Sequence, residues 1–301
     1  MGELKQHQPS MTIEEQVENL KSIGLVIKDE EYAKKILNDI SYFRLIKAYS
    51  LNLKPKNGSY EDGTTFEQIV ELYLFNANFR QIIFPEIEKV EINVRCRIAN
   101  YFSEHYGVLG YLEADNFANL EYHQAFLDDI EEEIRRNLKA PFVKNFRENY
   151  EGGNLPIYAL VEVLSFGTLS KLYKNMKNPD KKAVARSFGV GYTYFESWLE
   201  SIAYVRNICA HYGRLYNAKL SKTPILYKEY SQAGIGNNRI FGVLLCLKHL
   251  LKNNSHWNLF VDEIELLLEK YEAVDINTMG YPENWKELLN TTPESAGEIA
   301  S

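Results

Sequence analysis

The chain is poor in cysteine and has no long apolar run. Its three cysteines, Cys96, Cys209 and Cys246, lie far apart and form no C-x-x-C pair. An odd and scattered set argues against a disulfide framework and against a zinc site, and it fits a reducing compartment. No stretch approaches the run of about 18 apolar residues typical of a membrane helix, and no secretory signal is visible at the start. We therefore expect a cytoplasmic globular protein with no membrane association.

Several chemical motifs are also missing. The sequence has no G-x-x-x-x-G-K phosphate loop, no complete G-x-G-x-x-G loop, no G-x-S-x-G elbow and no H-E-x-x-H motif. Nucleotide-cofactor, serine-hydrolase and zinc-protease chemistry therefore have no support, and we expect neither a metal nor a cofactor. The net charge is -7, whereas a protein that coats nucleic acids without selectivity is usually basic. Any nucleic-acid role must use a local basic site.

Helical signals dominate what is present. Thr12 stands three residues before Glu15, and Thr64 three residues before Glu67. This is the spacing of a capping box, in which the two side chains satisfy each other's backbone amides at the start of a helix. The first box predicts a helix to about residue 23. The second predicts a long helix to residue 106, with a kink or break at Pro85.

Other segments have apolar residues at helical period, and no alternation of strands with helices is evident. We expect helices at residues 31–37, 41–53, 120–138, 156–176, 192–212, 239–252 and 257–273. The prediction is an all-α fold built as a bundle. We expect three parts: an N-terminal helical segment (1–62) packing on the bundle, the main helical domain (63–290) and a flexible tail (291–301).

One polar cluster lies near the end of the 192–212 helix, where residues 206–217 read RNICAHYGRLYN. On a helical wheel, one stripe is apolar and expected to be buried: Trp198, Ile202, Val205, Cys209 and Tyr212. Arg206, Asn207, His211 and Arg214 lie off this stripe. Every charged residue between positions 201 and 222 is basic, Lys219 among them. We expect Cys209 to be a small core residue rather than a nucleophile.

His211 has three readings. Histidine exchanges a proton near neutral pH, and arginine is a permanent cation suited to phosphate, so the cluster has the chemistry for metal-free phosphodiester cleavage. Alternatively, His211 sits favourably at the negative end of a helix that stops at Gly213. It can also belong to a plain solvated face. Spacing alone does not choose among these readings.

The cluster resembles the R-N-x-x-x-H form of the Rx4-6H signature of HEPN-superfamily ribonucleases. The longer block resembles that of abortive-infection (Abi) phage-resistance proteins, the AbiD/AbiF-like group. Four further blocks resemble this group in the same order: LNDISYFRL at 37–45, IEKVEINVR at 87–95, LPIYALVEVLSFGTL at 155–169 and MGYPENW at 279–285. The resemblance spans about residues 12–286.

The resemblance implies an HEPN-like helical bundle with additional N- and C-terminal helices. It implies a metal-independent endoribonuclease of phage defence, in which a ribose 2′-hydroxyl attacks the neighbouring phosphate. His211 is the implied acid and base, and Arg206 the group that stabilises the phosphorane. Asn207 would orient His211 or the phosphate, while Arg214 and Lys219 would hold the RNA backbone. One imidazole cannot easily act as base and acid on opposite sides of a phosphate, which favours a homodimer. An antitoxin or a phage-derived trigger is a further candidate partner.

Three residues of the other blocks are candidate supports. Glu91 and Arg95 are four apart, so they form either a surface ion pair or a group that orients Arg206 and His211. Glu162 lies in an apolar stretch and is expected to pair with an arginine such as Arg206 or Arg95. The alternative function is a non-catalytic RNA- or protein-binding helical module in a defence or toxin–antitoxin system. A helical scaffold or antitoxin-like partner is a third interpretation.

Overall fold

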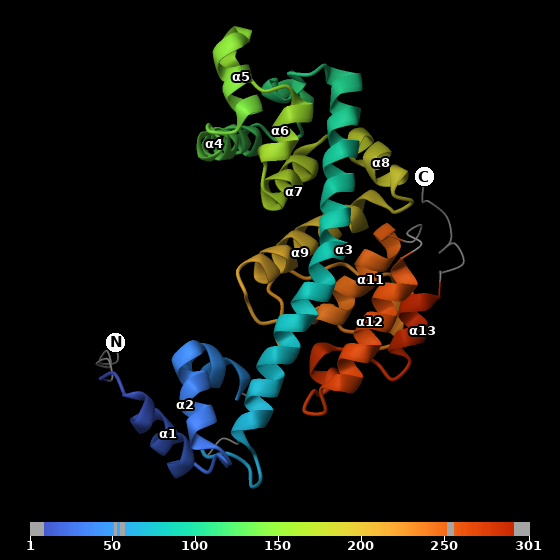
Figure 1. Ribbon diagram of the computed structural model, residues 1–301. Helices are drawn as coiled ribbons and strands as arrows, with labels where there is room; N and C mark the ends of the chain where they lie inside the picture. The colour runs from blue at the N-terminus through green and yellow to red at the C-terminus, as the bar shows by residue number, and fades with distance from the viewer. Residues whose placement is uncertain (1–8, 51–52, 55–57, 252–255, 292–301) are drawn as a thin grey trace, which may run out of the picture. The chain divides into compact units, whose positions relative to one another are not determined.

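The computed structural model describes residues 9–50, 53–54, 58–251 and 256–291 (Figure 1). Over these ranges the regular structure is helical, with two isolated bridges, Val26 to Thr65 and Phe117 to Met176, and no strand. The predicted all-α bundle is confirmed. The chain divides into two compact units, Met1–Phe79 with Leu266–Val274 and Arg80–Glu265 with Asp275–Ser301. The first unit thus extends past residue 62, and the expected tail beyond residue 291 lies outside the described residues.

The first unit is built from short amphipathic helices. Its elements are α1 (Ile13–Ser22), α2 (Glu30–Asp39), the π-helix η1 (Phe43–Lys47), the start of α3 (Phe66–Tyr106) and the end of α12 (Trp257–Lys270). The capping box predicted for α1 is confirmed, because the Thr12 amide donates to Glu15 Oε2 at 2.7 Å and the Glu15 amide to Thr12 Oγ1 at 3.2 Å. The helix predicted for 41–53 has a π-helical centre and ends at residue 49.

The box predicted at Thr64 and Glu67 is wrong by one residue. The Thr65 amide donates to Gln68 Oε1 at 2.9 Å, and the Gln68 amide donates back to Thr65 Oγ1 at 3.2 Å. A distant segment decides the register: the Val26 amide donates to the Thr64 carbonyl and the Phe66 amide to the Val26 carbonyl, both at 2.9 Å. These bonds hold Thr64 outside the helix, so Thr65 becomes the cap.

Pro85 does not break α3, which runs without interruption from Phe66 to Tyr106. Proline removes one backbone hydrogen bond and crowds the preceding turn. Pro85 lies on the exposed side of the helix, as does Gln81, whose carbonyl loses its partner. Water can satisfy that carbonyl, and the buried Ile83 and Ile87 anchor the opposite side.

The second unit carries the polar cluster and is arranged around α9 (Tyr192–Ala210). In it, α9 packs against α7 (Phe166–Asn175), α8 (Asn178–Ser187) and α11 (Ile240–Leu251) (Figure 1). The other elements of this unit are α4 (Leu120–Arg136), α5 (Pro141–Asn149), α6 (Ile157–Val163), α10 (Lys228–Gln232), α13 (Trp285–Asn290), the remainder of α3 and α12, and the 3-10 turns η2 (Gly110–Leu112), η3 (Ala114–Asn116), η4 (Glu151–Gly153) and η5 (Ile276–Met279). The sequence patterns missed α5, α8, α10 and α13.

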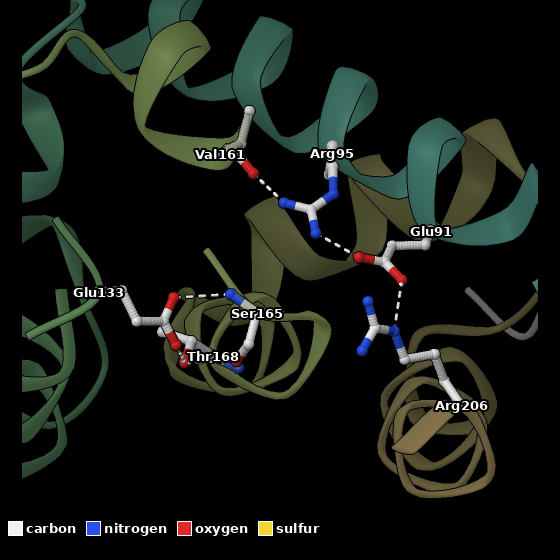
Figure 2. A network of polar contacts seen from close by, with 7 residues as sticks. All are labelled: Glu91, Arg95, Glu133, Val161, Ser165, Thr168 and Arg206. Carbon is white, nitrogen blue, oxygen red and sulfur yellow. Dashed lines mark hydrogen bonds and ion pairs between the residues drawn. The ribbon is translucent and has the colours of Figure 1, made fainter. Parts of the chain in front are cut away.

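The single helix predicted for 156–176 is wrong, because the chain turns at Ser165. The helical stretches Glu151–Val163 and Phe166–Asn175, which contain α6 and α7, are bent by 113° relative to each other. Ser165 caps α7 by accepting the Thr168 amide at 3.1 Å. Glu133 of α4 reinforces the turn by accepting the Ser165 amide and the Thr168 hydroxyl, each at 2.6 Å (Figure 2). Within the described ranges no single helix is long and apolar enough to cross a membrane, although this bent pair meets the criteria of length and composition when counted together.

Lys248 is a buried cation on α11. It is 4% exposed, and its Nζ donates to the Leu288 carbonyl at 2.5 Å. Burial lowers the pKa of Lys248 to about 8. Between pH 8 and the ordinary lysine pKa of about 10.4, the native state has lost the proton while the unfolded chain still holds it. The contribution of Lys248 to the free energy of unfolding therefore rises with pH between these two values.

Lys248→Met should raise the melting temperature by a few degrees at pH 7, because it removes the cost of burying the charge. The advantage over wild type should shrink as the pH rises from 8 to 10, which thermal unfolding at stepped pH measures. Lys228→Met, at an exposed position, should change little at any pH. If the stabilisation by Lys248→Met stays constant or grows with pH, the lowered pKa of Lys248 is wrong.

Candidate functional site

The buried side of α9 matches most of the predicted stripe. Trp198, Ile202, Val205 and Cys209 are all buried. Burial raises the pKa of the Cys209 thiol to about 12, so the sulfur remains protonated at neutral pH and is a core atom rather than a nucleophile. Tyr212 does not belong to the stripe, since the residue is 69% exposed.

The end of α9 explains why Tyr212 leaves the stripe. His211 is the last residue with a helical bond, its amide donating to the Asn207 carbonyl at 3.0 Å. Tyr212 then takes a left-handed backbone, with φ of 57°. Its amide donates to Cys209 at 3.2 Å, and the Gly213 amide donates to Ile208 at 2.7 Å. This pair of bonds is a Schellman motif, which turns the chain out of the helical path.

Gly213 ends the helix for a reason other than the predicted one. The left-handed position of the motif usually holds glycine, but here Tyr212 occupies it. Gly213 follows, where a Cβ atom would lie 2.8 Å from Ile208 Cγ2 and 3.1 Å from the Ile208 carbonyl oxygen. Glycine is required at this point by space, because any side chain would collide with the last turn of α9.

Asn207 and His211 are both exposed, one helical turn apart at the end of α9. In the part of the chain that the structure describes, the His211 ring makes no hydrogen bond and no ion pair. The ring is therefore neither a satisfied core histidine nor locked to a carboxylate. An imidazole in this setting is accessible to a ligand on the surface.

Arg206 lies beside a buried carboxylate on α3. Its Nε donates to Glu91 Oε2 at 3.3 Å, and Glu91 is 7% exposed (Figure 2). Arg95 donates to the other oxygen of Glu91 and also to the Val161 carbonyl of α6. One carboxylate thus faces two guanidinium groups, and a net positive charge remains. The i,i+4 pair exists as predicted, but it is buried and it reaches Arg206.

The outer edge of Arg206 is available for a ligand. Its guanidinium carbon lies 5.8 Å from the centre of the Phe84 ring. Among the described residues only its Nε makes a hydrogen bond, so both terminal nitrogens remain for an acceptor. Because Glu91 holds the group from one side, the two terminal nitrogens are presented in a fixed fork. That geometry suits two oxygens of a phosphate.

Glu162 does not take the predicted role. It is exposed, and over the described ranges it forms no ion pair with Arg206, Arg95 or any other residue. Successive residues of a helix point about 100° apart. The neighbouring Val161 offers its carbonyl to Arg95, while the Glu162 side chain is solvated.

Arg214 and Lys219 differ in their surroundings. Arg214 is half-buried, and its Nη1 donates to the carbonyls of Tyr216 and Asn217 at 3.0 and 3.4 Å, so it shapes the loop that follows α9. Lys219 is exposed. The loop itself is a built structure, since Asn217 has a second left-handed backbone, with φ of 48°.

Two arginines that the sequence patterns did not single out fix this loop. Arg80 of α3, 8% exposed, donates to the Gly213 carbonyl at 2.9 Å. Arg239 donates to Asn217 Oδ1 at 3.2 Å. Gly280 packs so closely on Arg239 that a Cβ atom would lie 2.8 Å from the Arg239 Cβ. The C-terminal MGYPENW block therefore supports the loop, although it lies far from it in sequence.

Over its described residues the protein is all-helical, with an arginine fixed on a buried glutamate and an exposed histidine at the end of the same helix. A family model described as Abi-like protein matches residues 35–217, more than half of the chain and including residues 206–217. The chain belongs to the Abi-like protein family, and this membership suggests a role in abortive-infection phage defence. No curated protein and no solved structure matches the chain.

Glu91→Gln should lower the free energy of unfolding by about 2–4 kcal/mol, because removing the charge leaves two buried or half-buried guanidinium groups without their carboxylate. Urea denaturation measures this loss. Glu88→Gln is the matched control on the exposed side of the same helix and should stay within about 0.5 kcal/mol of wild type. Equal stability of the two variants would show that the shared carboxylate is not a structural anchor.

Proposed function

We propose that this Abi-like protein is a metal-independent endoribonuclease of the HEPN type, acting in abortive-infection phage defence. One observation carries the proposal. An exposed His211 ends the helix on which Glu91 holds Arg206 through its Nε, and within the described part of the chain no acceptor occupies the two terminal nitrogens. The all-helical fold and the R-N-x-x-x-H spacing support it.

The reaction needs two proton transfers and one charge-stabilising group. A base removes the proton of a ribose 2′-hydroxyl, and the oxygen attacks the adjacent phosphorus. The bond to the 5′-oxygen breaks as an acid protonates that oxygen. The products are a 2′,3′-cyclic phosphate and a 5′-hydroxyl. His211 serves as base or acid, and the Arg206 terminal nitrogens donate to the phosphorane oxygens.

The neighbouring polar residues have assignable roles in this scheme. Asn207 lies one turn before His211 on the exposed side of α9 and orients the imidazole or the phosphate. Lys219 is exposed and holds the RNA backbone through its charge. Arg214 shapes the loop and adds positive charge to it. Glu91 and Arg95 position Arg206 and touch no substrate.

Two copies of the chain complete the chemistry in this proposal. A single imidazole is poorly placed to act on both the attacking and the leaving oxygen, which lie on opposite sides of the phosphorus. A homodimer would supply a second His211 for the second proton transfer. An antitoxin or a phage-derived trigger would then control the activity of the assembled site.

His211→Ala should reduce RNA cleavage by about 10² to 10⁴, the usual contribution of a general acid or base. Arg206→Ala should reduce it by about 10² to 10³, as loss of a donor to a developing oxyanion does. Gel analysis of cellular RNA incubated with EDTA, followed by end-group analysis for cyclic phosphate, measures both effects. His256→Ala, an exposed histidine at the start of α12, should cleave like wild type.

Three results would contradict this assignment: full activity of His211→Ala, loss of cleavage in EDTA, or products with a 3′-hydroxyl. RNA retention without any product would favour the non-catalytic binding module instead. Arg206→Lys separates charge from geometry, because lysine keeps the charge but cannot bond Glu91 and present a fork together. Its activity should lie between wild type and Arg206→Ala.

A further inference from the structure

Tyr212 follows His211 directly and has an unusual conformation for its residue type. Its backbone is left-handed, with φ of 57°, and the residue is 69% exposed. A side chain with a Cβ atom rarely adopts this conformation, and helix ends of this kind normally place glycine or asparagine there. A large aromatic ring is thus kept on the surface at a position where the fold favours another residue.

The backbone under this ring is fixed on both sides. The Tyr212 amide is held by the Cys209 carbonyl and the Gly213 amide by the Ile208 carbonyl, at 3.2 and 2.7 Å. The Gly213 carbonyl accepts from the buried Arg80 at 2.9 Å. Because these hydrogen bonds hold the turn, the exposed ring loses little conformational freedom when it contacts a ligand.

The chemistry of an exposed tyrosine beside a proton-transfer histidine points to a nucleobase. Unstacked bases of single-stranded RNA are recognised by stacking on aromatic side chains. Tyrosine supplies a large contact area for such stacking and loses little side-chain entropy when it binds. Every base has a π-face, so such contacts tolerate sequence variation.

We propose that Tyr212 stacks on the base of a nucleotide flanking the scissile phosphate and so positions that phosphate between Arg206 and His211. This inference rests on the proposed ribonuclease function. It makes Tyr212 a substrate-binding residue and defines the substrate class as RNA with an unpaired base at the cut. The ring then selects unpaired over paired RNA and discriminates weakly among the four bases.

Tyr212→Asn removes the ring and suits the left-handed backbone, so the variant should melt at or above the wild-type temperature. Its affinity for a fluorescein-labelled single-stranded RNA of mixed sequence should fall about tenfold, within the range of losses seen when a stacked aromatic is removed. The rate of cleavage at limiting RNA should fall by a similar factor. Tyr212→Phe keeps the ring and should retain most of the affinity and cleavage rate that Tyr212→Asn loses.

A synthetic RNA with an abasic ribose beside the mapped cut tests the stacking partner itself. Removing that base should weaken binding to wild type about tenfold and to Tyr212→Asn much less, because the two changes delete the same contact. The salt dependence of binding should be the same for Tyr212→Asn and wild type, since stacking releases no counterions. Tyr122→Asn, which alters a tyrosine 60% exposed on α4, is the matched control and should bind RNA like wild type.

The inference is overturned if Tyr212→Asn binds and cleaves RNA like wild type, if Tyr212→Phe is as impaired as Tyr212→Asn, or if Tyr212→Asn melts below wild type. Additive losses from the abasic RNA and from Tyr212→Asn would also overturn it. Wild-type protein that neither binds nor cleaves RNA would instead overturn the proposed function. Wild-type cleavage combined with an unaffected Tyr212→Asn would remove only the stacking role.

Discussion

The arrangement of α9 depends on one buried carboxylate. An ionised carboxylate removed from water costs several kcal/mol unless opposite charges and hydrogen bonds compensate it. Glu91 obtains that compensation from Arg95 on its own helix and Arg206 on α9, and Arg95 also bonds the Val161 carbonyl of α6 (Figure 2). Three helices are thus joined by charge-assisted hydrogen bonds, and the Arg206 side chain has a defined direction rather than a set of solvated rotamers.

Local signals predicted the elements that local interactions determine. The Thr12 box and the apolar periods of α4, α9 and α11 gave helices close to those observed, because each pattern lies within one segment. The errors arise where a residue far away in the sequence determines where a helix begins or ends. Val26 moves the start of α3 by one residue, and Glu133 of α4 stabilises the turn at Ser165 that divides the predicted 156–176 helix. No window along the chain contains both partners of such contacts.

The site shows the same division. The motif at 206–211 singled out Arg206 and His211 as candidates, and spacing predicted the pair of Glu91 and Arg95 that the structure contains. Glu162 was misread because an apolar sequence environment does not say which way a helix face points. Arg80 and Arg239 were missed because they act on a backbone carbonyl and an amide oxygen of a remote loop, and such partners leave no periodic or charge signal.

The uninterrupted path of α3 past Pro85 has a mechanical consequence. Arg80, which holds the loop after α9, and Glu91, which holds Arg206, lie on either side of this proline. They are eleven positions apart on an unbroken helix, which is about 16 Å along its axis. The helix therefore fixes the distance between Arg80 and Glu91. A displacement of the loop that Arg80 holds would act on the same helix that positions the Arg206 guanidinium.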